Sequence, residues 1–294
     1  MAKIDVSKFA KGAIESPFDP RDYALSSVMP VVMRYPDVCP APFDLTKKNQ
    51  GQNPSCVPNA ASLINQEKKL LQKVSQEYDA EDFYKELKKI DGYPGPGTFF
   101  RVAMQYLKDE NVKLLGGDTS TTKIAKYALV DDMSFEGLKK AIFLYGSILV
   151  GFRGSNEGWQ SEFIRAPKPG ETMWQHAVAL VGYEKDYIVG QNSWGKEWGN
   201  QGQFKIDKNY LPFEAWAIIV DSPVEPQPIK TGWVAQKYLQ MTGGTWKATA
   251  KLNVRRDAGT SFEIIKTLVK GSVVLPTNTP TKTANGYVWN QIVV

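Results

Sequence analysis

Histidine and cysteine are scarce in this sequence: its 294 residues include one histidine, His176, and two cysteines, Cys39 and Cys56. A single imidazole argues against a metal site built from histidines and leaves one place where histidine can exchange protons. Two cysteines are too few for a disulfide framework in a chain of this length, which indicates synthesis in a reducing compartment. We therefore expect no metal or other cofactor.

Long apolar runs are also missing. No stretch of 18 or more consecutive apolar residues is present, so we expect no transmembrane helix. The N-terminal residues lack the continuous apolar stretch of a secretory signal, which predicts a protein made in the cytoplasm without a signal peptide. Dense runs of Lys and Arg with interleaved aromatic residues are absent as well, so nucleic acid and membranes are not expected partners.

Positive charge is concentrated at the C-terminal end of the chain. Residues 223–294 hold nine Lys/Arg against three Asp/Glu, whereas residues 1–222 hold 27 against 28. This change coincides with a stretch that contains three prolines and favours an extended spacer. We therefore expect an N-terminal extension, a main domain, a Pro-rich linker and a C-terminal domain, bounded as 1–40, 41–220, 221–230 and 231–294.

Within the main domain, helical patterns come first and strand patterns follow them. Apolar residues at helical spacing predict helices at 57–74, 99–114 and 135–145. Short apolar runs predict strands at 148–152, 176–183, 187–191 and 204–206. This order favours an α+β fold with segregated halves. In the C-terminal domain, short alternating segments separated by Gly, Asn and Thr predict a small all-β barrel or sandwich.

Cys56 and His176 are the candidates for nucleophile and base. Cys56 follows a turn-forming stretch and precedes a helical pattern. A thiol at a helix N-terminus lies in the positive end of the helix dipole, and a nearby imidazolium stabilises its thiolate further. Each residue also has an ordinary alternative, His176 as a packed strand residue and Cys56 as a small buried hydrophobe. For Cys39 we adopt that ordinary alternative.

The spacing of several motifs resembles that of the papain-like cysteine peptidases. Gln50, within NQG, lies six residues before Cys56; His176 opens an apolar strand; and NSWGKEWGNQG begins at Asn192. In that family the His and Asn follow the Cys by about 130–150 residues, and here the separations are 120 and 136. The stretch GQNPSCVPNA is similar to the bacterial and phage branch. The resemblance covers about residues 17–215 and implies a two-lobed peptidase with a helical lobe and an antiparallel β lobe.

The resemblance implies a role for each matching residue. Cys56 would attack the scissile carbonyl as a thiolate, and His176 would hold the proton and give it to the leaving amine. Asn192 would orient the imidazole, while Gln50 would donate a hydrogen bond to the oxyanion together with the backbone N–H of Cys56. Taken singly, Gln50 and Asn192 have the alternative of turn residues, and Trp194 that of a core aromatic. Because all of these residues occur together at the spacing of the family, a catalytic role is favoured over these separate alternatives.

Other residues are candidates for binding the substrate. GYPGPGTFF resembles the Gly-rich wall that pairs with the substrate backbone in this family, although Pro96 stands where a glycine is usual. Trp194 would cover the His–Asn hydrogen bond. Trp174 and Gln175, the two residues before His176, are expected to line the same cleft. The candidates are Gly97, Phe99, Trp174, Gln175 and Trp194. Residues 1–40 are too short for the long helical prosegment of many papain-like enzymes, but they could still cross the cleft as a prosegment does.

The C-terminal domain resembles a bacterial SH3-like domain over about 45 residues, with LNVR at 252–255 as the matching core. Such domains commonly bind cell-wall peptide or glycan, and a charge of +6 would favour association with an anionic wall. The alternative is a stabilising appendage without a ligand.

Together, the peptidase-like domain and the SH3-like domain resemble a phage endolysin. The expected function is a cysteine endopeptidase that cleaves an amide bond of peptidoglycan and acts at the bacterial cell wall after release. One alternative is a general protein-cleaving papain-like peptidase of bacterial or phage origin. Another is a binding protein whose catalysis has lapsed. A transglutaminase-like acyl transferase is disfavoured, because it typically uses an Asp where this sequence has the Asn of NSWG.

Overall fold

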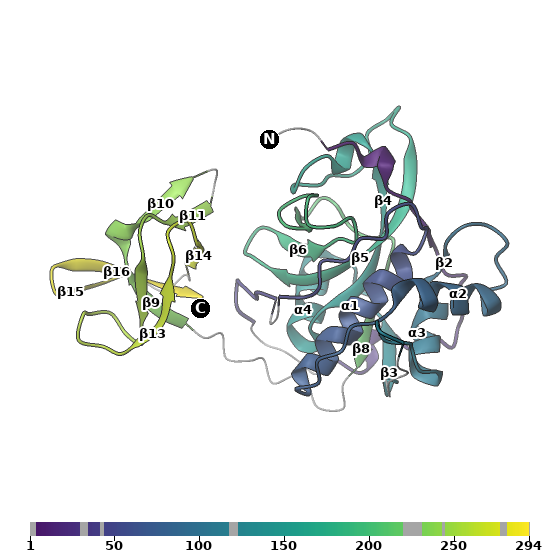
Figure 1. Cartoon of the computed structure of the whole chain (residues 1–294), viewed down its shortest axis with the longest axis horizontal. Coiled ribbons are helices and arrows are strands. Elements are labelled where there is room, and N and C mark those ends of the chain that lie inside the picture. The colour runs from purple at the N-terminus through teal and green to yellow at the C-terminus, as the bar shows by residue number, and fades with distance from the viewer. Residues whose placement is uncertain are drawn as a thin grey trace. The chain divides into compact units, whose positions relative to one another are not determined.

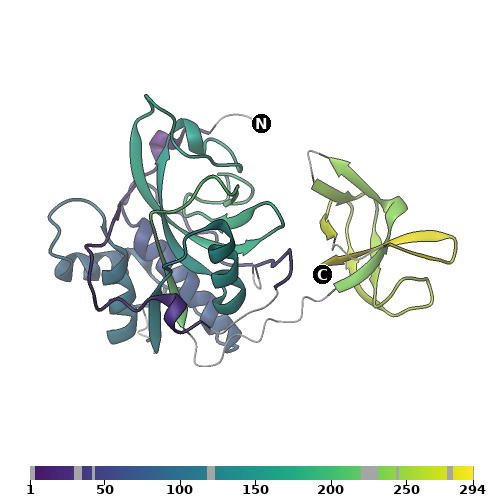
Figure 2. The same ribbon diagram turned by 180° about the vertical axis from the view of Figure 1, so that it is seen from behind.

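The chain forms two compact units, Met1–Glu225 and Pro226–Val294, in a computed structural model (Figures 1 and 2). The structure describes residues 4–29, 35–41, 44–117, 123–219, 231–242, 245–276 and 281–293. The expected Pro-rich linker, residues 221–230, lies outside the described residues. Among the described helices, none has both the length and the apolar character needed to cross a bilayer.

A six-stranded antiparallel sheet forms the centre of the first unit, with the strand order β3-β8-β4-β5-β6-β7. Its strands are β3 (Lys126–Leu129), β4 (Ile148–Ser155), β5 (Met173–Tyr183), β6 (Ile188–Gln191), β7 (Gln203–Ile206) and β8 (Glu214–Ile219). The four strands expected from the sequence correspond to β4 to β7. The structure adds β3 and β8, which pair with each other.

Helices cover both faces of this sheet. They are α1 (Cys56–Leu71), α2 (Ala80–Ile90), α3 (Phe100–Asp109) and α4 (Phe135–Tyr145). Side chains of α1, α2 and α3 share a core with Leu149 and Ala179, whereas α4 shares the opposite core with Val150 and Val178. Because neighbouring strand residues point to opposite faces, the two cores lie on the two sides of the sheet, as Figures 1 and 2 show from front and back.

The helix α1 is the most buried of these four helices, with every residue from 56 to 68 buried. Its charged residue Glu67 is fully buried and accepts hydrogen bonds from the N–H of Ser147 at 2.7 Å and from its hydroxyl at 2.8 Å. Lys68 pairs with the same carboxylate at 2.8 Å. A buried charge is tolerated when it is paired and hydrogen-bonded. These contacts fix α1, and therefore its first residue Cys56, against the start of β4.

The second unit is built from eight short strands. They are β9 (Thr231–Ala235), β10 (Leu239–Thr242), β11 (Thr245–Ala248), β12 (Leu252–Arg255), β13 (Ile264–Leu268), β14 (Val273–Pro276), β15 (Lys282–Ala284) and β16 (Tyr287–Val293). They pair in the order β10-β11-β14-β16-β9-β12-β13, with β15 added beside β16. Val234, Val254 and Ile292 lie in its small core. The LNVR segment forms β12, and this unit is all β, as its sequence predicts.

Candidate active site

Cys56 is the first residue of α1 and is fully buried. The preceding turn is held by Ser55, whose hydroxyl donates to the carboxylate of Glu81 on α2 at 2.7 Å. Burial raises the pKa of the Cys56 thiol to about 11, although the backbone N–H groups of Ala177 and Gly12 act in the opposite direction. The sequence predicted a lowered pKa from the helix dipole. Removal of water from the thiol outweighs that dipole here.

His176 lies on β5, and Asn192 directly follows β6, which pairs with β5. His176 Nε2 and Asn192 Oδ1 are 2.8 Å apart, and both residues are fully buried. The backbone N–H of Ser193 also donates to Asn192 Oδ1 at 2.8 Å, so the amide oxygen faces the imidazole. Because an amide oxygen only accepts, Nε2 carries the hydrogen and Nδ1 keeps its lone pair. The imidazole is therefore ready to take a proton at Nδ1.

Both reacting groups are uncharged in this arrangement. Burial lowers the pKa of His176 to about 3; the hydrogen bond to Asn192 raises that pKa, and the ammonium of Lys11 lowers it. Cys56 is close to the same strand, because the N–H of Ala177, the neighbour of His176, acts on its sulfur. The structure therefore places the thiol beside the strand that carries the imidazole.

Tryptophan rings enclose the imidazole. Trp194 stacks on His176 with 4.6 Å between ring centroids and is buried. Trp174 and Trp159 meet the imidazole edge-on, with centroid distances of 6.2 and 5.6 Å. Trp159 follows β4 in a short 3-10 helix (Glu157–Trp159), and no motif in the sequence marks it as a site residue. Water is excluded from the His–Asn hydrogen bond, which strengthens it.

Gln50 is held from both ends of its side-chain amide. Gln50 Nε2 donates to the carbonyl of Asn53 at 2.8 Å and to the carbonyl of Ala10 at 3.1 Å. Its Oε1 accepts from the hydroxyl of Ser193 at 2.6 Å. The amide N–H groups are therefore directed at two peptide carbonyls, and an oxyanion donor needs an N–H that is directed at a carbonyl oxygen.

One of the two carbonyls that Gln50 contacts, that of Ala10, belongs to residues 9–14, here called the covering segment. Ala10 supplies the carbonyl at Gln50 Nε2, and two residues later the N–H of Gly12 acts on the sulfur of Cys56. One short peptide stretch therefore contacts both the candidate nucleophile and the candidate oxyanion donor. Gln50 and Cys56, which are six residues apart in the sequence, face the same segment.

Side chains and backbone hold the covering segment along its length. Phe9 stacks on Trp194 with 5.0 Å between centroids and an interplanar angle of 7°. The ammonium of Lys11 lies over the rings of Trp174 and Trp194, at 5.3 and 5.7 Å from their centroids. At its end, β1 (Ala13–Ile14) pairs in parallel with β2 (Thr98–Phe99). The segment thus crosses from the tryptophan rings of the sheet to the helical side of the unit.

Two glycines permit the close approach of this segment. A Cβ at Gly12 would lie 2.1 Å from the carbonyl oxygen of Pro54, and a Cβ at Gly97 would lie 2.2 Å from the carbonyl oxygen of Gly12. Gly97 also has φ +93°, which other residues rarely adopt. Any side chain at either position would collide with backbone.

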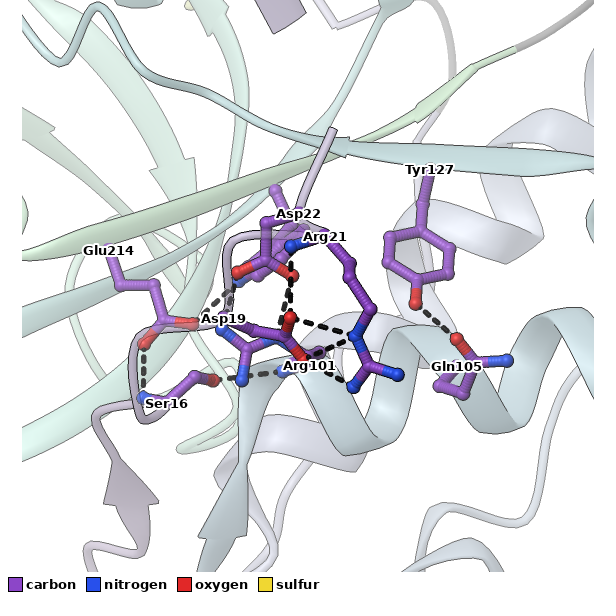
Figure 3. Close-up of polar contacts among 9 residues, drawn as sticks. Ser16, Asp19, Arg21, Asp22, Arg101, Gln105, Tyr127 and Glu214 are labelled. Atoms are coloured by element: carbon purple, nitrogen blue, oxygen red, sulfur yellow. Dashed lines mark hydrogen bonds and ion pairs between the residues drawn. The ribbon is translucent and has the colours of Figure 1, made fainter. Parts of the chain in front are cut away.

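The chain that follows the covering segment is fastened by polar contacts (Figure 3). The N–H of Ser16 donates to the carboxylate of Glu214 at 2.8 Å, and the N–H of Arg101 donates to the hydroxyl of Ser16 at 3.1 Å. Arg101 Nε donates to Asp22 Oδ1 at 2.7 Å, and Arg101 Nη2 donates to Asp22 Oδ2. This two-point contact is the strong form of an arginine–carboxylate pair.

The substrate-binding candidates fall into two groups. Gly97 and Phe99 lie beside the covering segment, since Gly97 faces Gly12 and Phe99 pairs with Ile14. Trp174 and Trp194 share the ring cluster around His176. Gln175 pairs with Arg153 of β4 and points to the opposite face of β5 from its two neighbours. The structure therefore does not bring Gln175 into that ring cluster.

Within the described part of the chain, no group of three or more His, Cys, Asp or Glu side chains could hold a metal ion. A thiol, an imidazole with a free Nδ1, an orienting amide and a carbonyl-directed amide are the parts of covalent acyl transfer by a cysteine.

A family comparison agrees with this geometry. The profile of the papain family of cysteine proteases matches residues 44–216. This chain belongs to that family. The matched range contains Gln50, Cys56, His176 and Asn192, and the α+β fold with its antiparallel sheet is papain-like.

Individual relatives are more distant. Rat procathepsin L is 30% identical over 188 residues, which cover 55% of this chain and 56% of that protein. A cathepsin L-like peptidase of Aedes aegypti is 29% identical over 142 residues, 38% of this chain and 40% of that protein. The chain thus matches well under two thirds of either relative.

Solved structures share the fold at low identity. Xylellain, a cysteine protease from Xylella fastidiosa, has a TM-score of 0.61 at 22% identity, covering 73% of this chain and 97% of that one. Procathepsin B of Trypanosoma congolense has a TM-score of 0.57 at 13% identity, covering 70% and 85%. At these sequence identities, the two comparisons show a shared fold and nothing about function.

Proposed function

We propose that this protein is a cysteine endopeptidase. His176 Nδ1 removes the proton of Cys56, and the thiolate attacks the scissile carbonyl. Gln50 Nε2 and the N–H of Cys56 stabilise the oxyanion, and the imidazolium gives its proton to the leaving amine. Water then cleaves the thioester and restores the thiol. The observation that carries this proposal is the peptide carbonyl of Ala10 on Gln50 Nε2, 3.1 Å away, beside the buried thiol.

The N-terminal residues are proposed to keep the enzyme latent, as a short prosegment does. The covering segment occupies the contacts that a substrate carbonyl needs, and it removes water from both reacting groups. A buried thiol with a raised pKa and a buried imidazole with a lowered pKa do not form the charged pair that attacks a carbonyl. Departure of the segment readmits water and favours the thiolate–imidazolium pair.

The substrate is proposed to be an amide bond of peptidoglycan, with the second unit as an SH3-like wall-binding domain. Support comes from the all-β architecture of that unit, from the LNVR segment in β12, and from the nine Lys/Arg against three Asp/Glu in residues 223–294. An endolysin-like enzyme of the bacterial and phage branch would act at the cell wall after release from the cell that makes it. The second candidate is a general protein-cleaving peptidase, which membership in a family of cysteine proteases supports.

Digestion of purified peptidoglycan sacculi from several Gram-positive hosts tests the proposal. The full chain and a variant without residues 1–14 are compared with Cys56→Ala, and released fragments are analysed by mass spectrometry. New free amines at one defined stem or cross-bridge bond, absent with Cys56→Ala, are the expected result. Cleavage of casein with intact sacculi would replace the lysin by the general peptidase. No cleavage of either substrate by the truncated variant would refute the peptidase proposal.

A further inference from the structure

Basic side chains far outnumber acidic ones in the second unit. Residues 231–294 contain eight Lys/Arg and two Asp/Glu. Both acidic side chains are engaged: Asp257 pairs with Lys282 at 2.7 Å, and Glu263 pairs with Arg256 at 2.6 Å. A carboxylate or phosphate partner for another basic side chain of this unit would therefore come from another molecule.

Lys237 lies between two tyrosine rings. It belongs to the 3-10 helix Gln236–Tyr238, which follows β9, and β9 pairs with β16, where Tyr287 is the first residue. The Lys237 ammonium is 4.7 Å from the ring centroid of Tyr238 and 4.3 Å from that of Tyr287. Hydrogen bonding to Tyr238 and to Tyr287 raises the pKa of Lys237, so both phenol oxygens lie close to the ammonium. One ammonium and two phenols therefore converge at one place.

The hydrogen-bonding chemistry of these three groups favours an anionic ligand. A protonated lysine only donates hydrogen bonds, so each phenol oxygen accepts from Lys237. The hydrogen of each phenol is then left to donate elsewhere. Lys237 is exposed, 37% of Tyr238 is exposed, and Tyr287 is half-buried. An oxyanion at this point would receive hydrogen bonds from the ammonium and from both phenols.

We propose that Lys237, Tyr238 and Tyr287 form a binding site for a phosphate group of an anionic wall polymer. Lysine and tyrosine both donate readily to phosphate oxygens. The excess of basic side chains in this unit favours a polymer with a phosphate in every repeat, because several cations then attract it at once. This inference rests on the proposed wall-binding role of the second unit, and it assigns that role to three side chains and one chemical group.

The alternative is attraction by the net charge of the unit, without a defined site. In that case every exposed lysine of the unit would contribute alike. Lys266 provides the matched control, because it is an exposed lysine on β13, which β9 and β12 separate from β16 in the strand order. Its replacement by methionine removes the same charge as Lys237→Met.

The test measures the binding of fluorescently labelled poly(glycerol phosphate) to the full chain by anisotropy, in the Cys56→Ala background so that cleavage plays no part. Lys237→Met should raise Kd about tenfold, because the site loses its charged donor. Tyr238→Phe combined with Tyr287→Phe keeps both rings and should raise Kd about fivefold through the loss of two hydroxyl donors. Lys266→Met should raise Kd less than about twofold, because an exposed charge away from the site is screened by salt.

Equal effects of Lys237→Met and Lys266→Met, or an unchanged Kd in the double Tyr→Phe variant, would overturn the site. Poly-glutamate and double-stranded DNA are added as competitors at equal concentrations of charged groups. If either displaces the probe as well as unlabelled poly(glycerol phosphate) does, the phosphate-bearing wall polymer is wrong as the ligand.

A second measurement uses Gram-positive sacculi before and after treatment with hydrofluoric acid, which removes phosphate-linked polymers and leaves the peptidoglycan. Binding of the Cys56→Ala chain should fall after this treatment, and unchanged binding would overturn the proposal. The expected binding pattern in a protein whose unsubstituted form cleaves nothing would support the site and count only against the peptidase function.

Discussion

Replacing Phe9 with alanine should expose Cys56 more often without altering the thiol itself. The Phe9 ring is half-buried and stacks on Trp194, with 5.0 Å between centroids and 7° between planes. An aromatic pair contributes about 0.5–1.5 kcal/mol beyond burial, and burying half of a Phe side chain adds about 1 kcal/mol. A loss near 2 kcal/mol corresponds to a roughly 30-fold larger population of the uncovered state.

The assay is the rate at which iodoacetamide alkylates each cysteine near neutral pH, followed by mass spectrometry of the two cysteine peptides. The rate at Cys56 is proportional to the uncovered population when the covering segment opens and closes faster than the thiol reacts. Burial raises the pKa of Cys39 to about 12, so this thiol reacts slowly and serves as an internal reference. Phe9→Ala should accelerate alkylation of Cys56 roughly 30-fold and leave Cys39 unchanged.

Phe18 supplies the matched control, because it belongs to the same N-terminal chain but is 91% exposed. Phe18→Ala should leave both alkylation rates unchanged. Equal rates at Cys56 in the wild type and in Phe9→Ala would refute the idea that the covering segment limits access. Equal acceleration by Phe18→Ala would point to a general loosening of the N-terminal chain instead.

Two further predictions concern the Arg101–Asp22 ion pair and the protonation of His176. Arg101→Gln removes the two-point contact with Asp22, so alkylation of Cys56 should accelerate about tenfold, whereas Arg21→Gln, at a largely exposed arginine, should not change that rate. Because burial lowers the pKa of His176 from 6.5 to about 3, the unfolded chain binds one proton more than the folded chain between these values. The free energy of unfolding should therefore fall as pH decreases through this window, by at most about 1.4 kcal/mol per unit, and His176→Gln should flatten that slope in urea titrations.

The helical and strand patterns of the first unit were predictable where the apolar period is strong. The expected helix at 57–74 is found as α1, and the strands 148–152 and 176–183 are found within β4 and β5. The helix α2 was missed, although Asp79 caps it by accepting from the N–H groups of Glu81 and Asp82. Its buried residues Ala80, Phe83 and Leu87 recur at helical spacing, so the sequence carried the pattern that predicts this helix.

The members of the candidate site could be named from the sequence, but their electrostatic state could not. Motif spacing proposed Gln50, Cys56, His176 and Asn192 as candidates, because their spacing in the sequence resembles that of one family. The raised pKa of Cys56 depends on burial by residues more than forty positions earlier in the chain, and no local pattern encodes it. Trp159 likewise reaches His176 only through the packing of strands.

Under the proposed function, the attachment of the covering segment to the rest of its unit would determine how a substrate gains access to Cys56. Ser16 is fastened to Glu214 only two residues after β1 ends, so an opened segment stays within a short reach of Cys56. A ligand on such a short connection has an effective concentration on the order of millimolar. Dilution would not lower this effective concentration, so under the proposed function a micromolar peptide substrate would compete with a segment at a much higher effective concentration. If the chain is cut between Ile14 and Ser16, the segment becomes a free peptide. Its concentration then equals that of the protein and falls on dilution.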